Sequence, residues 1–173
     1  MDPRDARLQD LLDRQDLADL VLRYCRCIDR RQFDKLRPLY HADARHDHGG
    51  MFQGNPADLI AWLSRTTPAA MVTHHFVGNM LFQVDGDRAE GEIYTINTHR
   101  FPAATGARDY IASGRYLDRY ERRNGVWRFS FRQRIADWTH EGAAQPAAMA
   151  AGLRAGATDG SDPSFALRTL AAL

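Results

Sequence analysis

The spacing of apolar residues changes from a helical repeat to a strand-like repeat about 70 residues into the chain. Over residues 6–31 apolar positions recur three and four apart, which predicts an amphipathic helix. A second, short helix is expected over residues 33–40. Asn55 followed by Pro56 predicts the N-cap and first turn of a third helix that continues through residues 57–65.

Residues beyond Pro68 show the alternation and turn residues of β-strands. A short strand closed by two glycines is predicted earlier, at residues 44–50. Asn124-Gly125 is a strong hairpin signal, and residues 85–87 (Asp-Gly-Asp) predict another reversal. The long predicted strands cover residues 71–84, 91–101, 110–123 and 126–138.

Helices followed by a meander of long strands predict an α+β fold. A curved antiparallel sheet covered by helices on one face leaves a concave, cone-shaped interior that can hold a ligand. We expect one domain over residues 1–140. Residues 141–173 are rich in Ala and Gly, show no periodicity, and are expected to be mobile or to lie against a neighbouring subunit or over the cone.

Composition argues against several classes of partner. The formal net charge of +1 gives no electrostatic reason to expect nucleic acid or an anionic membrane. No apolar run approaches the roughly 20 residues of a membrane span, and the charged start of the chain is unlike a signal peptide. Cys25 and Cys27 fall on different faces of the first helix, so they are expected to pack rather than to pair. These features favour a cytoplasmic protein.

Two adjacent histidines in the strand 71–84 must point to opposite faces. The face of His75 also carries polar residues, including Asn79, and suits the lining of a cavity. The face of His74 carries more apolar residues and is expected to pack on the helices. A lone histidine in a strand is commonly structural, so both interpretations stay open.

Other polar residues have competing interpretations. Asp29 falls at the end of the first helix, where the helix dipole disfavours a carboxylate, and it is either exposed or functional. Alternating arginines near Arg132 form an exposed ladder unless some point inward. His46 and His48 share a face and could begin a metal site, but no third ligand is evident, so we expect no metal. The sequence contains no Gly-rich phosphate loop, GxSxG or CxxC motif, so nothing supports nucleotide binding or covalent catalysis.

Three segments together resemble a known family: RYCRCIDRRQFDKLRPLYHADARHDHGG, THHFVGN and YERRNGVWRFSFRQ. They are similar to the SnoaL-like branch of the nuclear-transport-factor-2-like superfamily. Within that branch they resemble the group of scytalone dehydratase, bile acid 7α-dehydratase and γ-hexachlorocyclohexane dehydrochlorinase. The resemblance covers roughly residues 8–138 and implies a cone of curved antiparallel sheet wrapped around helices.

The resemblance also implies roles for individual residues. Asp29 and His75 match the catalytic aspartate and histidine, Arg132 matches a pocket arginine, and Tyr24 matches a tyrosine with the same spacing to the aspartate. Asn97 lies near a position where members of the group have Asp or His, so the proton shuttle is left to one dyad. The expected catalytic residues are therefore Asp29, His75, Tyr24 and Arg132. Substrate contacts are expected from Asn97, His46, His48, Tyr116 and Asn79.

We therefore expect a cofactor-independent lyase, similar to a dehydratase, that acts on a small hydrophobic cyclic or aromatic substrate through an Asp–His general base. An isomerase or a C–C lyase could use the same dyad. A non-catalytic small subunit of a ring-hydroxylating dioxygenase and a ligand-binding module are further alternatives. Relatives of this kind are commonly trimers, so a homo-oligomer, and a trimer in particular, is also expected.

Overall fold

The computed structural model describes residues 2–144 and 152–167 of the chain. Its α-helices and long strands follow each other along the chain in the predicted order. The α-helices and strands are α1 (Pro3–Asp29), β1 (Tyr40–Asp47), β2 (Gln53–Gly54), α2 (Pro56–Thr66), β3 (Val72–Asp85), β4 (Arg88–Pro102), β5 (Ala107–Arg123) and β6 (Val126–Ala143). Short 3-10 helices are η1 (Phe33–Leu39), η2 (Gly49–Met51), η3 (Thr67–Ala69) and η5 (Pro163–Ala166). The second predicted helix is thus a 3-10 helix, and Tyr40 already belongs to β1.

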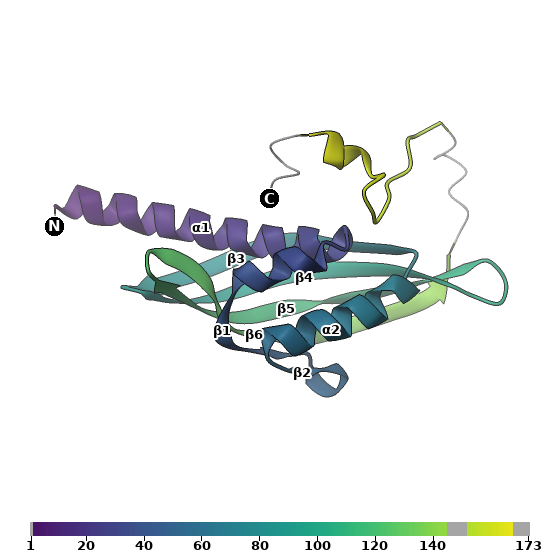
Figure 1. Ribbon diagram of the computed structural model, residues 1–173, viewed down its shortest axis with the longest axis horizontal. Helices are drawn as coiled ribbons and strands as arrows, with labels where there is room; N and C mark the ends of the chain where they lie inside the picture. Colours follow the sequence, from purple (N-terminus) through teal and green to yellow (C-terminus); the bar gives the residue numbers. More distant parts are fainter. Residues whose placement is uncertain (1, 145–151, 168–173) are drawn as a thin grey trace.

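The six strands form one sheet in the order β2-β1-β6-β5-β4-β3. The four long strands are antiparallel neighbours, as predicted, whereas β1 runs parallel to β6. The sheet is therefore mixed at one edge, and the predicted α+β class is confirmed. Figure 1 shows α1 lying along the sheet, with α2 beside the shorter strands.

The β5–β6 hairpin turns at Asn124 and Gly125, which both have positive φ angles, of 54° and 76°. Two consecutive left-handed residues define the type I′ turn, whose twist matches that of the flanking strands. The hairpin prediction is confirmed. The predicted third helix is also confirmed, because the Asn55 side chain accepts the Asp58 N–H at 3.0 Å and Pro56 occupies the first turn of α2.

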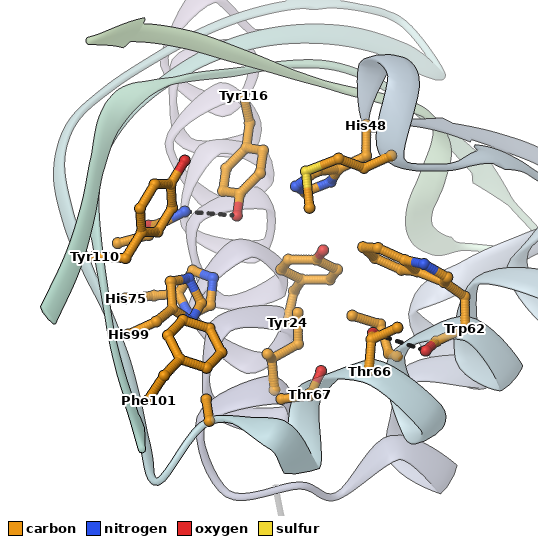
Figure 2. A pocket seen from close by; sticks show the side chains of 15 residues that line it. Tyr24, His48, Trp62, Thr66, Thr67, His75, His99, Phe101, Tyr110 and Tyr116 are labelled. Atoms are coloured by element: carbon orange, nitrogen blue, oxygen red, sulfur yellow. Dashed lines mark hydrogen bonds between the residues drawn. The ribbon is translucent and has the colours of Figure 1, made fainter. Parts of the chain in front are cut away.

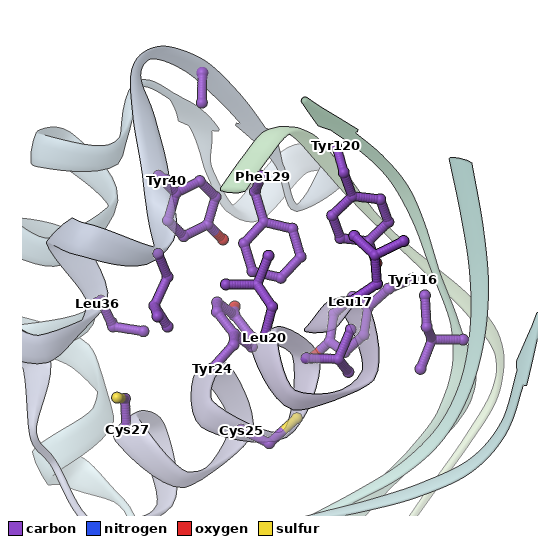
Figure 3. Packing of buried hydrophobic residues seen from close by; sticks show 14 of the residues in the cluster. Leu17, Leu20, Tyr24, Cys25, Cys27, Leu36, Tyr40, Tyr116, Tyr120 and Phe129 are labelled. Atoms are coloured by element: carbon purple, nitrogen blue, oxygen red, sulfur yellow. The ribbon is translucent and has the colours of Figure 1, made fainter. Parts of the chain in front are cut away.

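The core lies between the second half of α1 and the concave face of the sheet. Figure 3 shows Leu17, Leu20 and Tyr24 of α1 packed against aromatic rings of the curved strands. Cys25 and Cys27 are both free and buried, as expected for packing residues. By contrast, the leucines of the first α1 turns are more than half exposed. Burial of the α1 stripe therefore fixes its C-terminal half on the sheet.

A β-bulge interrupts β3 between Val77 and Met80. Before the bulge Thr73 is buried and Phe76 is 59% exposed, so the face of His75 points inward. After the bulge the pattern shifts by one residue: Phe82 is buried and Leu81 is 67% exposed. The prediction that the His74 face packs on the helices is therefore wrong before the bulge and holds only after it, where Met80 and Phe82 join the core, because a single alternation does not hold along the whole strand.

A second irregularity lies in β6, where Phe129 pairs with Tyr120 and Phe131 pairs with Arg119. The extra residue, Ser130, puts Phe129 and Arg132 on the same face, and both are fully buried. Arg132 therefore points inward instead of continuing an exposed ladder.

The C-terminal region lies over the end of α1. β6 continues to Ala143, three residues past the predicted domain boundary at 140. Residues 145–151 and 168–173 of the predicted tail lie outside the described residues. Ser164 accepts a hydrogen bond from Arg26 at 3.3 Å, and Asp162 lies 3.4 Å from Nε of Arg30. Figure 1 shows this segment above the C-terminal end of α1. No helix in the described parts of the chain is long and apolar enough to cross a membrane.

Candidate active site

Asp29 and His75 form a hydrogen-bonded pair between the end of α1 and strand β3. The Asp29 carboxylate accepts a hydrogen bond from Nδ1 of His75 at 2.7 Å through Oδ1, and from the backbone N–H of His75 at 3.0 Å through Oδ2. Both side chains are largely buried. A carboxylate at Nδ1 selects the tautomer with a proton on that nitrogen, so Nε2 keeps its lone pair. The pair predicted from the sequence is brought together.

The local backbone explains why α1 stops at Asp29. Arg31 adopts a left-handed φ of 53°, and Gln32 N–H donates to the carbonyl of Cys27 at 2.7 Å, which closes the helix end. A carboxylate at this end is disfavoured by the helix dipole. The two hydrogen bonds from His75 offset that cost and give each carboxylate oxygen a donor.

His75 lines a cavity of about 440 Å³. This volume lies in the range of roughly 300–1,000 Å³ that is common for small-molecule sites. The lining is mostly aromatic and apolar, with several histidines and tyrosines (Figure 2). The lining includes Tyr24, His48, Trp62, Asn97, His99, Phe101, Tyr110 and Tyr116. Such a cavity accommodates a small ring compound and offers it a few polar contacts.

Asn97 is the direct cross-strand neighbour of His75 in the β3–β4 ladder. Its Nδ2 donates to the Tyr116 hydroxyl at 3.4 Å. Its Oδ1 is buried and has no hydrogen-bond partner in the described parts of the chain. Since an unpaired buried carbonyl oxygen is costly, Asn97 is available to accept a hydrogen bond from a ligand. Asn97 and Tyr116, both expected to contact a substrate, line the cavity.

A chain of hydrogen bonds runs through Tyr40, His46 and His48. The Tyr40 hydroxyl lies 3.1 Å from Nδ1 of His46, and Nε2 of His46 lies 3.2 Å from Nδ1 of His48. His48 lines the cavity, whereas His46 is buried behind it. Burial lowers the pKa of both imidazoles, that of His48 to about 4. Both rings are therefore neutral near pH 7.

The two histidines lack the partners of a metal site. Within residues 2–144 and 152–167 no group of three or more His, Cys, Asp or Glu side chains is arranged to hold a metal ion. Both ring nitrogens of His46 form hydrogen bonds, Nδ1 with Tyr40 and Nε2 with His48.

Arg132 does not line the cavity, contrary to the prediction. It is fully buried and forms a bidentate ion pair with Asp118, at 2.8 and 2.6 Å. Its guanidinium lies 4.2 Å from the ring centre of Tyr24 and 4.1 Å from that of Tyr116. The Ser130 bulge aims Arg132 inward, but the two tyrosines separate it from the ligand space. Arg132 therefore supports the rings that form the cavity wall.

Asn79 is also misplaced by the sequence prediction. It lies in the β3 bulge and is exposed, outside the cavity. Sequence reasoning missed other cavity residues, namely His99, Trp62, Phe101 and Tyr110. His99 shares the inward face of β4 with Asn97, so alternation alone could have identified it. Burial, followed by the charge of nearby His75, lowers the pKa of His99 to about 4.

Comparisons with known proteins agree with this fold. A model of the SnoaL-like domain matches residues 9–133. An uncharacterized protein of Mycobacterium tuberculosis is 31% identical over 90 residues, which are 51% of this chain and 61% of that protein. The match thus spans about three-fifths of the length of this relative.

Two solved structures share the fold at low sequence identity. A type 3 hexachlorocyclohexane dehydrochlorinase from Novosphingobium barchaimii superposes with a TM-score of 0.73 and 22% identity, over 80% of this chain and 96% of the other. A nuclear-transport-factor-2-like protein with a cystatin-like fold from Novosphingobium aromaticivorans gives a TM-score of 0.66 at 22% identity, over 90% and 99% of the two chains.

Proposed function

The chain belongs to the SnoaL-like domain family, and on this basis we propose that it is a cofactor-independent lyase that acts on a small, hydrophobic cyclic or aromatic substrate. The observation that carries the proposal is the Asp29–His75 pair at the wall of an aromatic cavity. A neutral histidine held by a carboxylate is a general base suited to neutral pH. One similar fold is that of a dehydrochlorinase, which is an enzyme of the elimination type.

In the proposed reaction Nε2 of His75 takes a proton from a substrate carbon. The electron pair of the broken C–H bond forms a C=C bond, and the leaving group departs from the adjacent carbon with its own bonding pair. The imidazolium of His75 then gives its proton to the leaving group, either directly or through the Tyr24 hydroxyl, which passes on its own proton and takes that of His75. Asp29 stabilises the imidazolium while it exists. Arg132 takes no direct part, because Tyr24 and Tyr116 lie between it and the cavity.

Proton abstraction can be tested without knowing the natural leaving group. The purified protein is incubated in D₂O with cyclic ketones such as 2-tetralone, and NMR follows deuterium incorporation next to the carbonyl. A second panel of β-hydroxy and β-halo cyclic ketones is assayed for release of water or halide. We expect exchange and elimination with the wild type and a loss of both with His75→Gln.

His74→Gln is the matched control, because His74 is adjacent in sequence but exposed on the outer face of β3. It should retain both activities. Equal activity of wild type and His75→Gln would refute the proposed base. Exchange without any elimination in the panels would favour an isomerase.

A further inference from the structure

His48 lies at the cavity end of a polar chain that the proposed base does not use. The rings of His46 and His48 are within 9° of parallel, with centroids 5.5 Å apart and facing nitrogens 3.2 Å apart. This separation is too long for face-to-face contact and fits two rings joined edge to edge by one hydrogen bond. His48 is therefore held in a fixed orientation by a buried neighbour.

We assign the direction of the hydrogen bonds by taking the buried phenol as the first donor. Burial raises the pKa of Tyr40, so its hydroxyl keeps its proton and has it available to donate to Nδ1 of His46. His46 is neutral and then carries its proton on Nε2, which donates to Nδ1 of His48. His48 is neutral in turn and carries its proton on Nε2. Nε2 of His48 has no hydrogen-bond partner among the described residues, so it presents an N–H to the cavity.

The surroundings of His48 are electropositive. Arg134 is close enough to lower the pKa of His48 by its charge. Arg134 donates to the backbone carbonyl of Ala112 at 3.0 Å and forms no ion pair with a carboxylate in the described ranges. An N–H donor with a cation nearby favours an oxygen that carries negative charge.

His48 and His75 lie on different walls of the cavity, with Tyr24 and Tyr116 between them (Figure 2). A ring compound in this space can place a carbon near His75 and an oxygen near His48. The proton-accepting nitrogen and the proton-donating nitrogen are thus separated across one substrate.

We propose that His48 is a catalytic hydrogen-bond donor that binds the carbonyl oxygen of a cyclic ketone or enone and stabilises its enolate. The inference rests on the proposed function and names its substrate class. When His75 removes the carbon proton, the C–H electron pair moves into the enolate and its charge gathers on that oxygen. His48 keeps its proton and donates a hydrogen bond throughout, as a neutral imidazole does at other enolate-forming sites. Tyr40 and His46 are positioning residues that fix the tautomer of His48.

Binding of 4-nitrophenol tests the donor without any turnover, because the bound phenolate mimics an enolate and absorbs visible light. 4-Nitrotoluene, which has the same ring and no oxygen, is the matched ligand. We expect the wild type to prefer 4-nitrophenol and to raise its ionised fraction on binding. His48→Phe should lose this preference by roughly tenfold to a hundredfold, the range for a hydrogen bond to a charged group, and should keep its affinity for 4-nitrotoluene.

Tyr40→Phe tests the relay with a conservative change that removes one oxygen. In the wild type, ¹⁵N NMR of labelled histidine should show His48 protonated on Nε2. In Tyr40→Phe the His48 tautomer should become mixed and the ionised fraction of bound 4-nitrophenol should fall, whereas circular dichroism should stay unchanged. A wild-type His48 protonated on Nδ1, or a His48→Phe variant that still favours the phenolate, would overturn the inference.

Failure of this inference is distinguishable from failure of the proposed base. If ketone exchange requires His75 but is unaffected by His48→Phe, the role of His75 as base stands and the role of His48 as donor is refuted. If phenolate binding requires His48 but the protein catalyses no ketone exchange, the oxyanion site stands and the role of His75 as base is refuted.

Discussion

The carboxylate of Asp29 accepts two hydrogen bonds from His75, one from the ring N–H at 2.7 Å and one from the backbone N–H at 3.0 Å. Each carboxylate oxygen therefore has a defined task. One oxygen sets the tautomer of the imidazole, and the other fixes the strand that carries it. The geometry of the base depends on both contacts.

Asp29→Asn should lower kcat for ketone exchange by about 10²–10⁴-fold, with a smaller change in KM. An asparagine offers one acceptor oxygen for two N–H donors, so its NH₂ group faces either the ring or the backbone of His75. It also cannot stabilise imidazolium. Steady-state kinetics of deuterium exchange measure the effect. Asp34→Asn is the control because Asp34 is exposed, and wild-type kcat in Asp29→Asn would contradict the expected role.

Asp118→Asn should lower the free energy of unfolding by about 3–5 kcal/mol, because it leaves the buried guanidinium of Arg132 without its counter-charge. Urea denaturation followed by tryptophan fluorescence measures the loss. The matched control is Asp109→Asn, which breaks the partly exposed bidentate pair with Arg100. That change should cost at most about 1 kcal/mol. Equal losses in the two variants would show that burial of the Arg132 pair is unimportant.

Stability should fall as the pH is lowered from about 6.5 to about 4, the window between the ordinary histidine pKa and the lowered pKa of His48 and His99. Both values are lowered first by burial and then by nearby positive charge, from Arg134, His75 and, for His48, also His99 and Arg132. The unfolded chain binds these protons more readily than the folded protein, so acid favours unfolding. The shift corresponds to roughly 3 kcal/mol for each histidine taken alone.

Urea titrations at several pH values between 4 and 8 measure how the free energy of unfolding changes with pH. His46 also has a lowered pKa and adds to the same loss. His99→Gln removes one of these three groups and should make the profile less steep between pH 6.5 and 4. A wild-type profile that is flat over this range would contradict the lowered pKa values.

We expect a homo-oligomer, and a trimer in particular, that buries part of the outer face of the sheet. Phe76 and Ile96 are cross-strand neighbours on that face and are 59% and 43% exposed. Light scattering of the wild type should give a mass above that of the 19.6 kDa chain. Phe76→Asp should shift the mass toward the monomer if this face is the interface. A wild-type monomer at micromolar concentration would refute the prediction.

Periodicity and turn signals were sufficient for the two α-helices, the four long strands and their order, but they shifted the short strand β1 and missed β2. The amphipathic stripe of α1, the cap at Asn55 and the Asn124-Gly125 turn depend on local chemistry, and each local signal agrees with the structure. The resemblance added the pairing of Asp29 with His75, since no local pattern brings together two residues 46 positions apart.

The errors arise where one extra residue changes the face of a strand. Alternation placed Asn79 beside His75, but the bulge in β3 exposes it. A second bulge, at Ser130, turns Arg132 into the core, where it pairs with Asp118. A bulge is stabilised by packing across the whole sheet, so strand propensity does not reveal it. The Tyr40–His46–His48 chain was missed for a similar reason, because it depends on distances between side chains rather than on spacing along the chain.

The hydrogen bond between Arg26 and Ser164 joins positions 138 apart in the chain, three residues from Asp29. Closing so long a loop costs much chain entropy, and contacts of such high sequence separation slow folding. The hairpins β3–β4 and β5–β6 close over far shorter loops and can form first. The Arg26–Ser164 hydrogen bond, near the Asp29 end of α1, is therefore expected to be among the last contacts to form. A chain still emerging from the ribosome would assemble its cone, with Asp29 already bound to His75, before Arg26 met Ser164.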